Sequence, residues 1–177
     1  MVKTLIMAGG IGERLWPVSS EKRPKQFHHF GSAKTMIEET IERMEKLTGE
    51  LLIITTREQF PLIQYYTPLF KGDNVIFEPA GRNTAPAIAL GSTRFEDDDI
   101  MVIVPSDHII RDEETFLRTM KTAIEYAGKH EALVTIGITP TSPNTGYGYI
   151  ERGDCLNERE EVFAVRKFHE KPDYETA

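Results

Sequence analysis

The stretch AGGIGERLWPVSSEKRPKQ, residues 8–26, directly follows the apolar run TLIM of residues 4–7. This order predicts a strand that leads into a glycine loop. Three glycines within four positions let the backbone turn sharply, and the missing Cβ atoms allow an anion to approach the backbone closely. The chain has a formal net charge of -7, yet four cations follow the glycines: Arg14, Lys22, Arg23 and Lys25. The stretch therefore predicts a phosphate site.

Two familiar phosphate loops do not fit the sequence. A dinucleotide fingerprint needs a third glycine where Leu15 stands, which argues against a nicotinamide cofactor. A Walker A loop needs glycine directly before its lysine, and the only similar run has Ala33 before Lys34. We interpret Lys34-Thr35 as the start of a helix, with Ser32 as its candidate cap.

The whole stretch resembles the signature of the sugar-nucleotide pyrophosphorylases, in which G-G-x-G-x-R-L precedes P-K. The longer form, with Leu15-Trp16-Pro17, Ser19 and Pro24-Lys25-Gln26, is similar to the mannose-1-phosphate guanylyltransferase branch. A tight turn with a solvated basic loop is the alternative, but so many fixed positions rarely coincide. The resemblance implies a Rossmann-like nucleotidyltransferase domain.

Composition excludes several other classes of protein. The chain has 177 residues, of which 40% are hydrophobic and 28% are charged, as in a soluble globular domain. No apolar run approaches the roughly 20 residues of a membrane span, so we expect no membrane partner and a cytoplasmic location. The pI near 5.3 argues against a nucleic-acid partner. Cys155 is interpreted as a spare thiol, and a homo-oligomer stays open.

Helix and strand patterns alternate along the chain, which predicts an α/β fold with a mainly parallel sheet. Apolar runs typical of buried parallel strands lie at residues 4–7, 51–55, 74–77, 100–104 and 132–138. Helical spacing occurs at residues 34–47, 58–66 and 113–128, with a further helix near Pro86. Later strands, near residue 149 and over 162–168, follow without helices between them. We expect a three-layer α/β/α domain with a mixed sheet, whose antiparallel part covers the mouth of the site.

A second loop, EPAGRNTAP, follows the run at 74–77. Asn83 or Thr84 can cap the next helix, but capping does not require the other residues of the motif. In the family this segment lines the base and ribose. The resemblance therefore implies that the nucleotide-binding residues are Glu78, Gly81, Arg82 and Asn83, with Ala8, Gly9, Gly10, Gly12 and Arg14 in the first loop.

Asp107 follows the run at 100–104, at the sheet edge where α/β proteins bind ligands. Asp107 could instead cap a turn, although Asp112 is the better cap because it directly precedes the next helix. We expect Asp107 to contact the nucleotide and to hold Mg²⁺, a hard cation that suits a carboxylate. His28 and His29 point apart and have no carboxylate at ligand spacing, so we expect no metal there.

The resemblance also implies a reaction and a second subsite. Tyr147 and Gly148 match a Y-G motif, and Glu170 and Lys171 match an E-K-P motif, both of which hold the sugar phosphate in the family. The implied reaction transfers GMP from GTP to mannose 1-phosphate and releases pyrophosphate. Its predicted catalytic residues are Arg14 on the β and γ phosphates, Lys25 on the transferred group and Asp107 on the metal. A uridylyl- or thymidylyltransferase, or a sensor that binds without catalysis, are the alternatives.

In the family the domain continues beyond the E-K-P motif and supplies a second metal-binding aspartate. We therefore expect residues 1–177 to be the N-terminal part of a nucleotidyltransferase domain. Alone, this part is expected to bind GTP weakly and to catalyse transfer slowly or not at all.

Overall fold

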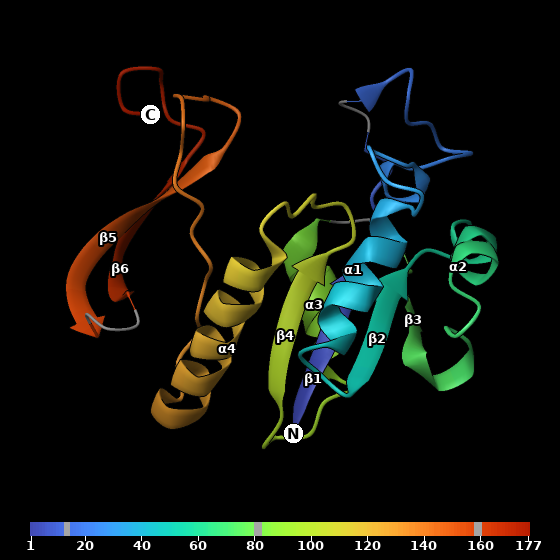
Figure 1. The fold of residues 1–177 in the computed structure, drawn as a ribbon, viewed down its shortest axis with the longest axis horizontal. Helices are drawn as coiled ribbons and strands as arrows, with labels where there is room; N and C mark the ends of the chain where they lie inside the picture. Colours follow the sequence, from blue (N-terminus) through green and yellow to red (C-terminus); the bar gives the residue numbers. More distant parts are fainter. Residues whose placement is uncertain (13–14, 80–82, 158–160) are drawn as a thin grey trace. The chain divides into compact units, whose positions relative to one another are not determined.

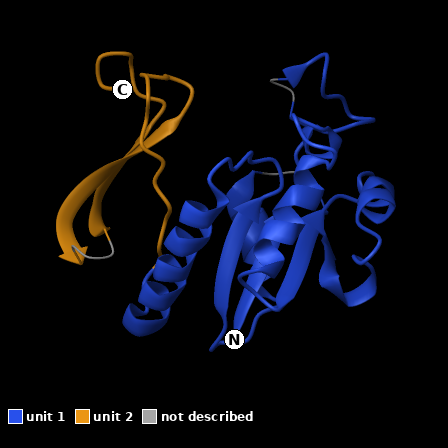
Figure 2. Ribbon diagram, in the orientation of Figure 1, with its two compact units in different colours: residues 1–132 blue, residues 133–177 orange. Residues whose placement is uncertain are grey.

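The computed structural model describes residues 1–12, 15–79, 83–157 and 161–177. These residues form two compact units, 1–132 and 133–177, which are coloured separately in Figure 2. No helix in the described ranges is long and apolar enough to cross a bilayer. Each unit is considered by itself below.

A four-stranded parallel sheet forms the centre of the first unit (Figure 1). Its strands are β1 (Val2–Met7), β2 (Glu50–Thr55), β3 (Val75–Phe77) and β4 (Ile100–Pro105), in the order β3-β2-β1-β4. The register sets Leu5 of β1 between Leu52 and Ile103. Because every pairing is parallel, all four carboxyl ends meet at one edge. This confirms the predicted fold class.

Helices cover both faces of this sheet. On one face α1 (Met36–Glu45), α2 (Phe60–Tyr66) and α4 (Glu113–His130) pack on a cluster that includes Ile6 and Ile53. On the other face α3 (Thr84–Ser92) packs on Leu5, and Figure 1 shows α1 and α3 on opposite sides of the sheet. A Cβ atom at Gly91 of α3 would collide with Leu5 Cδ2, so only glycine permits this approach. The three predicted layers are therefore present.

The caps of α1 and α4 test two predictions from the sequence. Thr35, and not Ser32, caps α1, because its hydroxyl accepts from Glu38 N–H. In return, Thr35 N–H donates to the Glu38 carboxylate at 2.7 Å, which completes a capping box. The Ser32 hydroxyl instead accepts from Lys34 N–H in the preceding loop, so that prediction is wrong. Asp112 caps α4 as predicted, since its carboxylate accepts from Thr115 N–H at 3.0 Å. Asp107 is thus not needed as the cap of α4.

The second unit contains an antiparallel hairpin of β5 (Gly148–Asn157) and β6 (Val162–Glu170). The predicted antiparallel strands thus form a sheet of their own, and their placement over the site stays a prediction. The strand predicted at residues 132–138 is wrong, because no strand lies there. Leu133 and Ile138 are exposed, and an extended run without a hydrogen-bonded neighbour is not a strand. Two short 3-10 helices, η2 (Lys25–Phe27) and η3 (Gly72–Asn74), belong to the first unit.

A buried ion pair joins β1 to the residue before β4. Lys3 Nζ lies 2.6 Å from Asp99 Oδ2, and the two side chains are 8% and 2% exposed. Hydrogen bonds from Lys3, from the terminal amine of Met1 and from Glu96 N–H hold the pKa of Asp99 well below its usual range. A carboxyl group whose pKa is lowered by folding stabilises the folded chain at pH values above the ordinary aspartate pKa. This stabilisation is lost as the pH falls toward the pKa of the folded state.

We therefore expect acid to destabilise the wild-type chain more than an Asp99→Asn variant. The variant should unfold at a lower temperature at neutral pH, and its melting temperature should fall less between about pH 5 and pH 2. Thermal unfolding across that range measures both effects, with the exposed Asp97→Asn as control. Equal pH slopes for wild type and Asp99→Asn would contradict this role.

Candidate active site

The glycine loop leaves β1 at the carboxyl edge, between the ends of β2 and β4. This is the switch point of the sheet order, where open α/β sheets bind ligands. Ala8 is fixed to β2, because its N–H donates to Ile54 O at 2.8 Å and its carbonyl accepts from Thr55 Oγ1 at 2.9 Å. Gly12 has φ of 76°, which favours glycine, and a Cβ there would lie 2.7 Å from Lys25 Cβ. The loop backbone at Gly12 thus lies close to the side chain of Lys25.

Two of the predicted catalytic residues meet beside this loop. Lys25 Nζ lies 3.4 Å from Asp107 Oδ2, and both side chains are partly exposed, at 28% and 36%. Lys25 N–H donates to Ile11 O at 3.3 Å, and Ser106 N–H donates to Met7 O at 3.0 Å. The first bond holds Lys25 on the glycine loop, and the second holds Ser106, the residue before Asp107, beside the end of β1. The pair therefore places one cationic group and one carboxylate side by side next to the glycine loop.

Glu78 reaches the same loop from β3. Its N–H donates to Thr55 O at 2.8 Å, which holds the residue at the end of the strand. A Cβ at Gly9 would collide with Glu78 Oε1, so the carboxylate lies directly against the loop backbone. Burial raises the pKa of Glu78. The arrangement extends the site across the carboxyl edge from β3 to β4.

Asn83 occupies the N-cap position of α3, but its side chain makes no capping hydrogen bond. Its backbone has φ of 65° and ψ of -179°, a conformation that costs most residues about 1–3 kcal/mol. Such strain clusters at ligand sites, and Asn83 is exposed. Capping alone therefore does not account for Asn83. Three further predicted residues, Arg14, Gly81 and Arg82, lie outside the described residues.

The four predicted sugar-phosphate residues come together at one end of the hairpin in the second unit. Gly148 pairs with Glu170 in the β5–β6 register, and a Cβ at Gly148 would lie 2.8 Å from Glu170 Oε2. Lys171 Nζ lies 3.0 Å from Glu170 Oε1, and Lys171 N–H donates to Tyr147 O at 3.1 Å. This end of the hairpin thus holds a carboxylate and an ammonium group side by side, next to the backbone of Tyr147.

A model of the family described as nucleotidyl transferase matches residues 3–177. The chain belongs to the nucleotidyl transferase family. Its curated relatives include mannose-1-phosphate guanylyltransferases from Salmonella muenchen and Klebsiella pneumoniae, which are 43% and 44% identical over 98% and 100% of this chain. The chain spans 38% and 39% of the length of those two relatives.

Solved structures share the fold of this chain. One from Thermus thermophilus, described as a mannose-1-phosphate geranyltransferase, has a TM-score of 0.85 and 34% identity, over 99% of this chain and 51% of that one. A mannose-6-phosphate isomerase from Helicobacter pylori has a TM-score of 0.78 and 30% identity, over 99% and 62% of the two chains. A structure from Bacillus anthracis described as a glucose-1-phosphate thymidylyltransferase, at 18% identity and a TM-score of 0.61, supports the fold alone.

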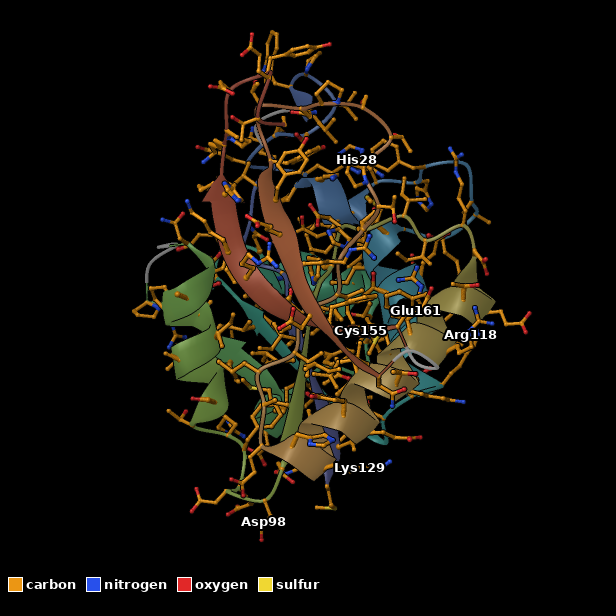
Figure 3. All side chains as sticks on the ribbon, turned by 90° about the vertical axis from the view of Figure 1, so that its left-hand side faces the viewer. His28, Asp98, Arg118, Lys129, Cys155 and Glu161 are labelled. Carbon is orange, nitrogen blue, oxygen red and sulfur yellow. The ribbon has the colours of Figure 1, made fainter. Side chains whose placement is uncertain are left out.

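Nucleotidyl transferases commonly use divalent metals, so the donor atoms in this chain matter. The described residues contain no group of three or more histidine, cysteine, aspartate or glutamate side chains that could hold a metal by themselves. His28, labelled in Figure 3, has its Nε2 atom 3.1 Å from Arg23 O, which is a hydrogen bond to the backbone. Cys155 is an exposed free thiol on β5. Asp107 is a partly exposed carboxylate that pairs with Lys25 beside the glycine loop.

Sequence reasoning missed two residues of this nucleotidyl transferase that hold the glycine loop. Gln26 ends the glycine-loop motif, which assigns it no role, and Gln59 belongs to no motif. Both side chains are buried and donate hydrogen bonds to loop carbonyls. Gln59 directly precedes α2 and has no local signal, because its partners are about fifty positions away in the sequence. Only the folded chain brings these amides to the loop.

Proposed function

We propose that this chain carries the nucleotide site of a mannose-1-phosphate guanylyltransferase, which transfers GMP from GTP to mannose 1-phosphate and releases pyrophosphate. The observation that carries the proposal is the Lys25–Asp107 pair beside the glycine loop, at the carboxyl edge of a parallel sheet. The names of the curated relatives support the choice of substrates.

The chemistry of the reaction explains why these residue types are needed. A phosphate oxygen of the sugar 1-phosphate attacks the α-phosphorus of GTP, and the bond to pyrophosphate breaks. The nucleophile is already an anion, so catalysis needs alignment and positive charge instead of a general base. Lys25 would neutralise charge at the transferred phosphoryl group, and the loop amides, with Arg14, would hold the β and γ phosphates.

Asp107 fits a role as a Mg²⁺ ligand. Its carboxylate is partly exposed at the end of β4, and Mg²⁺ is commonly held by one or two carboxylates together with substrate phosphates. The bound ion would supply charge neutralisation at the phosphate oxygens. In the structure Asp107 pairs with Lys25, so the carboxylate also holds the lysine ammonium at the site.

The carboxylate of Glu78 is suited to bind the guanine base and not the phosphates. A carboxylate against the loop would repel a phosphate group, because like charges at close range disfavour each other. The guanine base instead offers two adjacent donors, its N1–H and its 2-amino group, and a carboxylate can accept from both. We therefore assign the guanine base to the β3 side of the site and the phosphates to the loop.

Replacement of Glu78 by glutamine should reduce the preference for guanine. The wild type should bind GTP more tightly than inosine triphosphate, which lacks the 2-amino group, by roughly tenfold or more. Glu78→Gln should lose most of that difference, and calorimetric titration with both nucleotides measures it. Glu58→Gln, a glutamate outside the assigned site, is the control. A preference for GTP that survives Glu78→Gln would place the base elsewhere.

Glu170 and Lys171 should act on the sugar phosphate alone. Their removal should raise KM for mannose 1-phosphate by roughly tenfold or more, since hydrogen bonds to charged groups are lost, and should leave GTP binding unchanged. Steady-state kinetics of Glu170→Gln and Lys171→Ala measure this, with the exposed Lys167→Ala of β6 as control. Weaker binding of GTP together with an unchanged KM for mannose 1-phosphate would overturn the assignment.

One assay separates this function from its alternatives. Pyrophosphate release is measured with Mg²⁺ for GTP, UTP and dTTP, each with mannose 1-phosphate and glucose 1-phosphate. Preferred turnover of GTP with mannose 1-phosphate is expected, whereas preference for UTP or dTTP would indicate the uridylyl or thymidylyl alternative. Because residues 1–177 alone are expected to turn over slowly or not at all, the sensor would be favoured only by nucleotide binding without turnover in a longer protein that contains this chain. A cytoplasmic location and a homo-oligomer stay predictions of the sequence.

A further inference from the structure

Two buried glutamines form a bridge beneath the glycine loop. Gln26 and Gln59 are only 3% and 5% exposed, and Gln26 Nε2 donates to Gln59 Oε1 at 2.9 Å. Gln26 Nε2 also lies 3.3 Å from Ala8 O and 3.2 Å from Gly10 O. Gln59 Nε2 lies 2.9 Å from Gly9 O and 3.4 Å from Gly10 O. Three consecutive loop carbonyls are thus bound from one side.

The orientation of the two amide groups follows from the partners. A backbone carbonyl can only accept, so each glutamine must turn its NH₂ group, and not its oxygen, toward the loop. The Gln59 oxygen then remains free to accept from Gln26. The bridge is neutral, which matters because a buried charge at this depth would be costly.

This bridge determines where the loop amides point. In a planar trans peptide the N–H lies opposite the carbonyl of the preceding residue. Since the carbonyls of Ala8, Gly9 and Gly10 face the glutamines, the N–H groups of the residues that follow each of them face the other way. These N–H groups donate to no backbone carbonyl among the described residues. They therefore form a row of donors of the kind that binds anions.

We infer that Gln26 and Gln59 are positioning residues of the phosphate site, which fix the glycine loop with its N–H groups turned toward the bound triphosphate. This inference rests on the proposed function. The glutamines do not contact the nucleotide in this role, and they act through the loop backbone. Without the bridge, the peptide groups of the loop would rotate part of the time. Their N–H groups would then no longer converge on one anion.

The test uses two variants that remove donors in different ways. Gln59→Glu keeps the shape but replaces the NH₂ group with an oxygen, and Gln26→Met removes the donors without adding a charge. Gln64→Glu is the matched control, because Gln64 lies on α2 and is exposed. Binding of GTP and of guanosine, which carries no phosphate, is measured by NMR titration of the full chain. If the bridge acts only on phosphate binding, its loss should affect the binding of GTP and of guanosine differently.

We expect both bridge variants to weaken GTP binding by roughly tenfold or more while guanosine binding stays within about twofold of wild type. The control should bind both ligands like the wild type. Unchanged GTP binding in the bridge variants would overturn the inference, as would an equal loss for GTP and guanosine, which indicates a general loss of structure. A wild-type chain that binds neither ligand would instead refute the proposed function, and the inference with it.

Discussion

Replacement of Lys25 by alanine is expected to lower kcat for GMP transfer by about 10²- to 10³-fold, with a much smaller change in KM for GTP. In the proposed site the ammonium group, which lies beside Asp107, would face the charge that grows in the transition state, while the lysine stem packs against the backbone of Gly12. Interactions that strengthen only in the transition state act on kcat. Pyrophosphate release at saturating mannose 1-phosphate, measured across GTP concentrations, gives both constants.

The control for this prediction is Lys22→Ala, which removes an exposed lysine from the same stretch. It should leave kcat and KM near the wild-type values, because screening by solvent weakens an exposed charge. A normal kcat in Lys25→Ala, or an equal loss in both variants, would remove Lys25 from the catalytic residues.

Asp107→Asn should abolish most of the Mg²⁺-dependent activity while the fold survives. The amide matches the carboxylate in size but carries no charge, so several kcal/mol of metal-assisted stabilisation, or about 10²-fold or more in rate, should be lost. The loss should be partly recovered at high Mg²⁺ if the weakened site can still be filled. A Mg²⁺ titration of the rate measures this, and circular dichroism checks the fold.

Asp97→Asn is the matched control, since Asp97 is an exposed aspartate that precedes the same strand. It should follow the wild-type Mg²⁺ curve. Full activity of Asp107→Asn at ordinary Mg²⁺ concentrations would mean that Asp107 only pairs with Lys25 and does not hold the metal.

The sequence predicted those parts of the fold whose signals are local. The continuous apolar runs mark β1 to β4 correctly because strands buried on both faces need no polar alternation. The glycine loop was placed at the end of β1 for the same local reason. The run at residues 132–138 resembles those strands in composition, but a strand exists only where a neighbour pairs with it, and sequence alone does not supply the neighbour.

The sequence predicts only some residues of the candidate site, because most contacts within the site join residues that are far apart in the chain. The glycine motif and the position of Asp107 at a strand end identify two parts of the site separately, yet the approach of Lys25 to Asp107 depends on the sheet order. The hydrogen bonds from Gln59 to the loop span about fifty residues and leave no pattern near Gln59 itself. Likewise, Thr35 replaces Ser32 as the cap because α1 begins at Met36, the first apolar position of the pattern, and not at Lys34.

If the glycine loop binds the phosphates of GTP, an NMR titration of the ¹⁵N-labelled chain with GTP and Mg²⁺ should detect the binding at the loop amides themselves. We expect the amide signals of Gly9, Gly10 and Ile11 to shift together and to saturate. Gly49, which precedes β2 at the opposite edge of the sheet, should not shift. Saturable GTP binding that leaves the three loop amides unmoved would contradict the account.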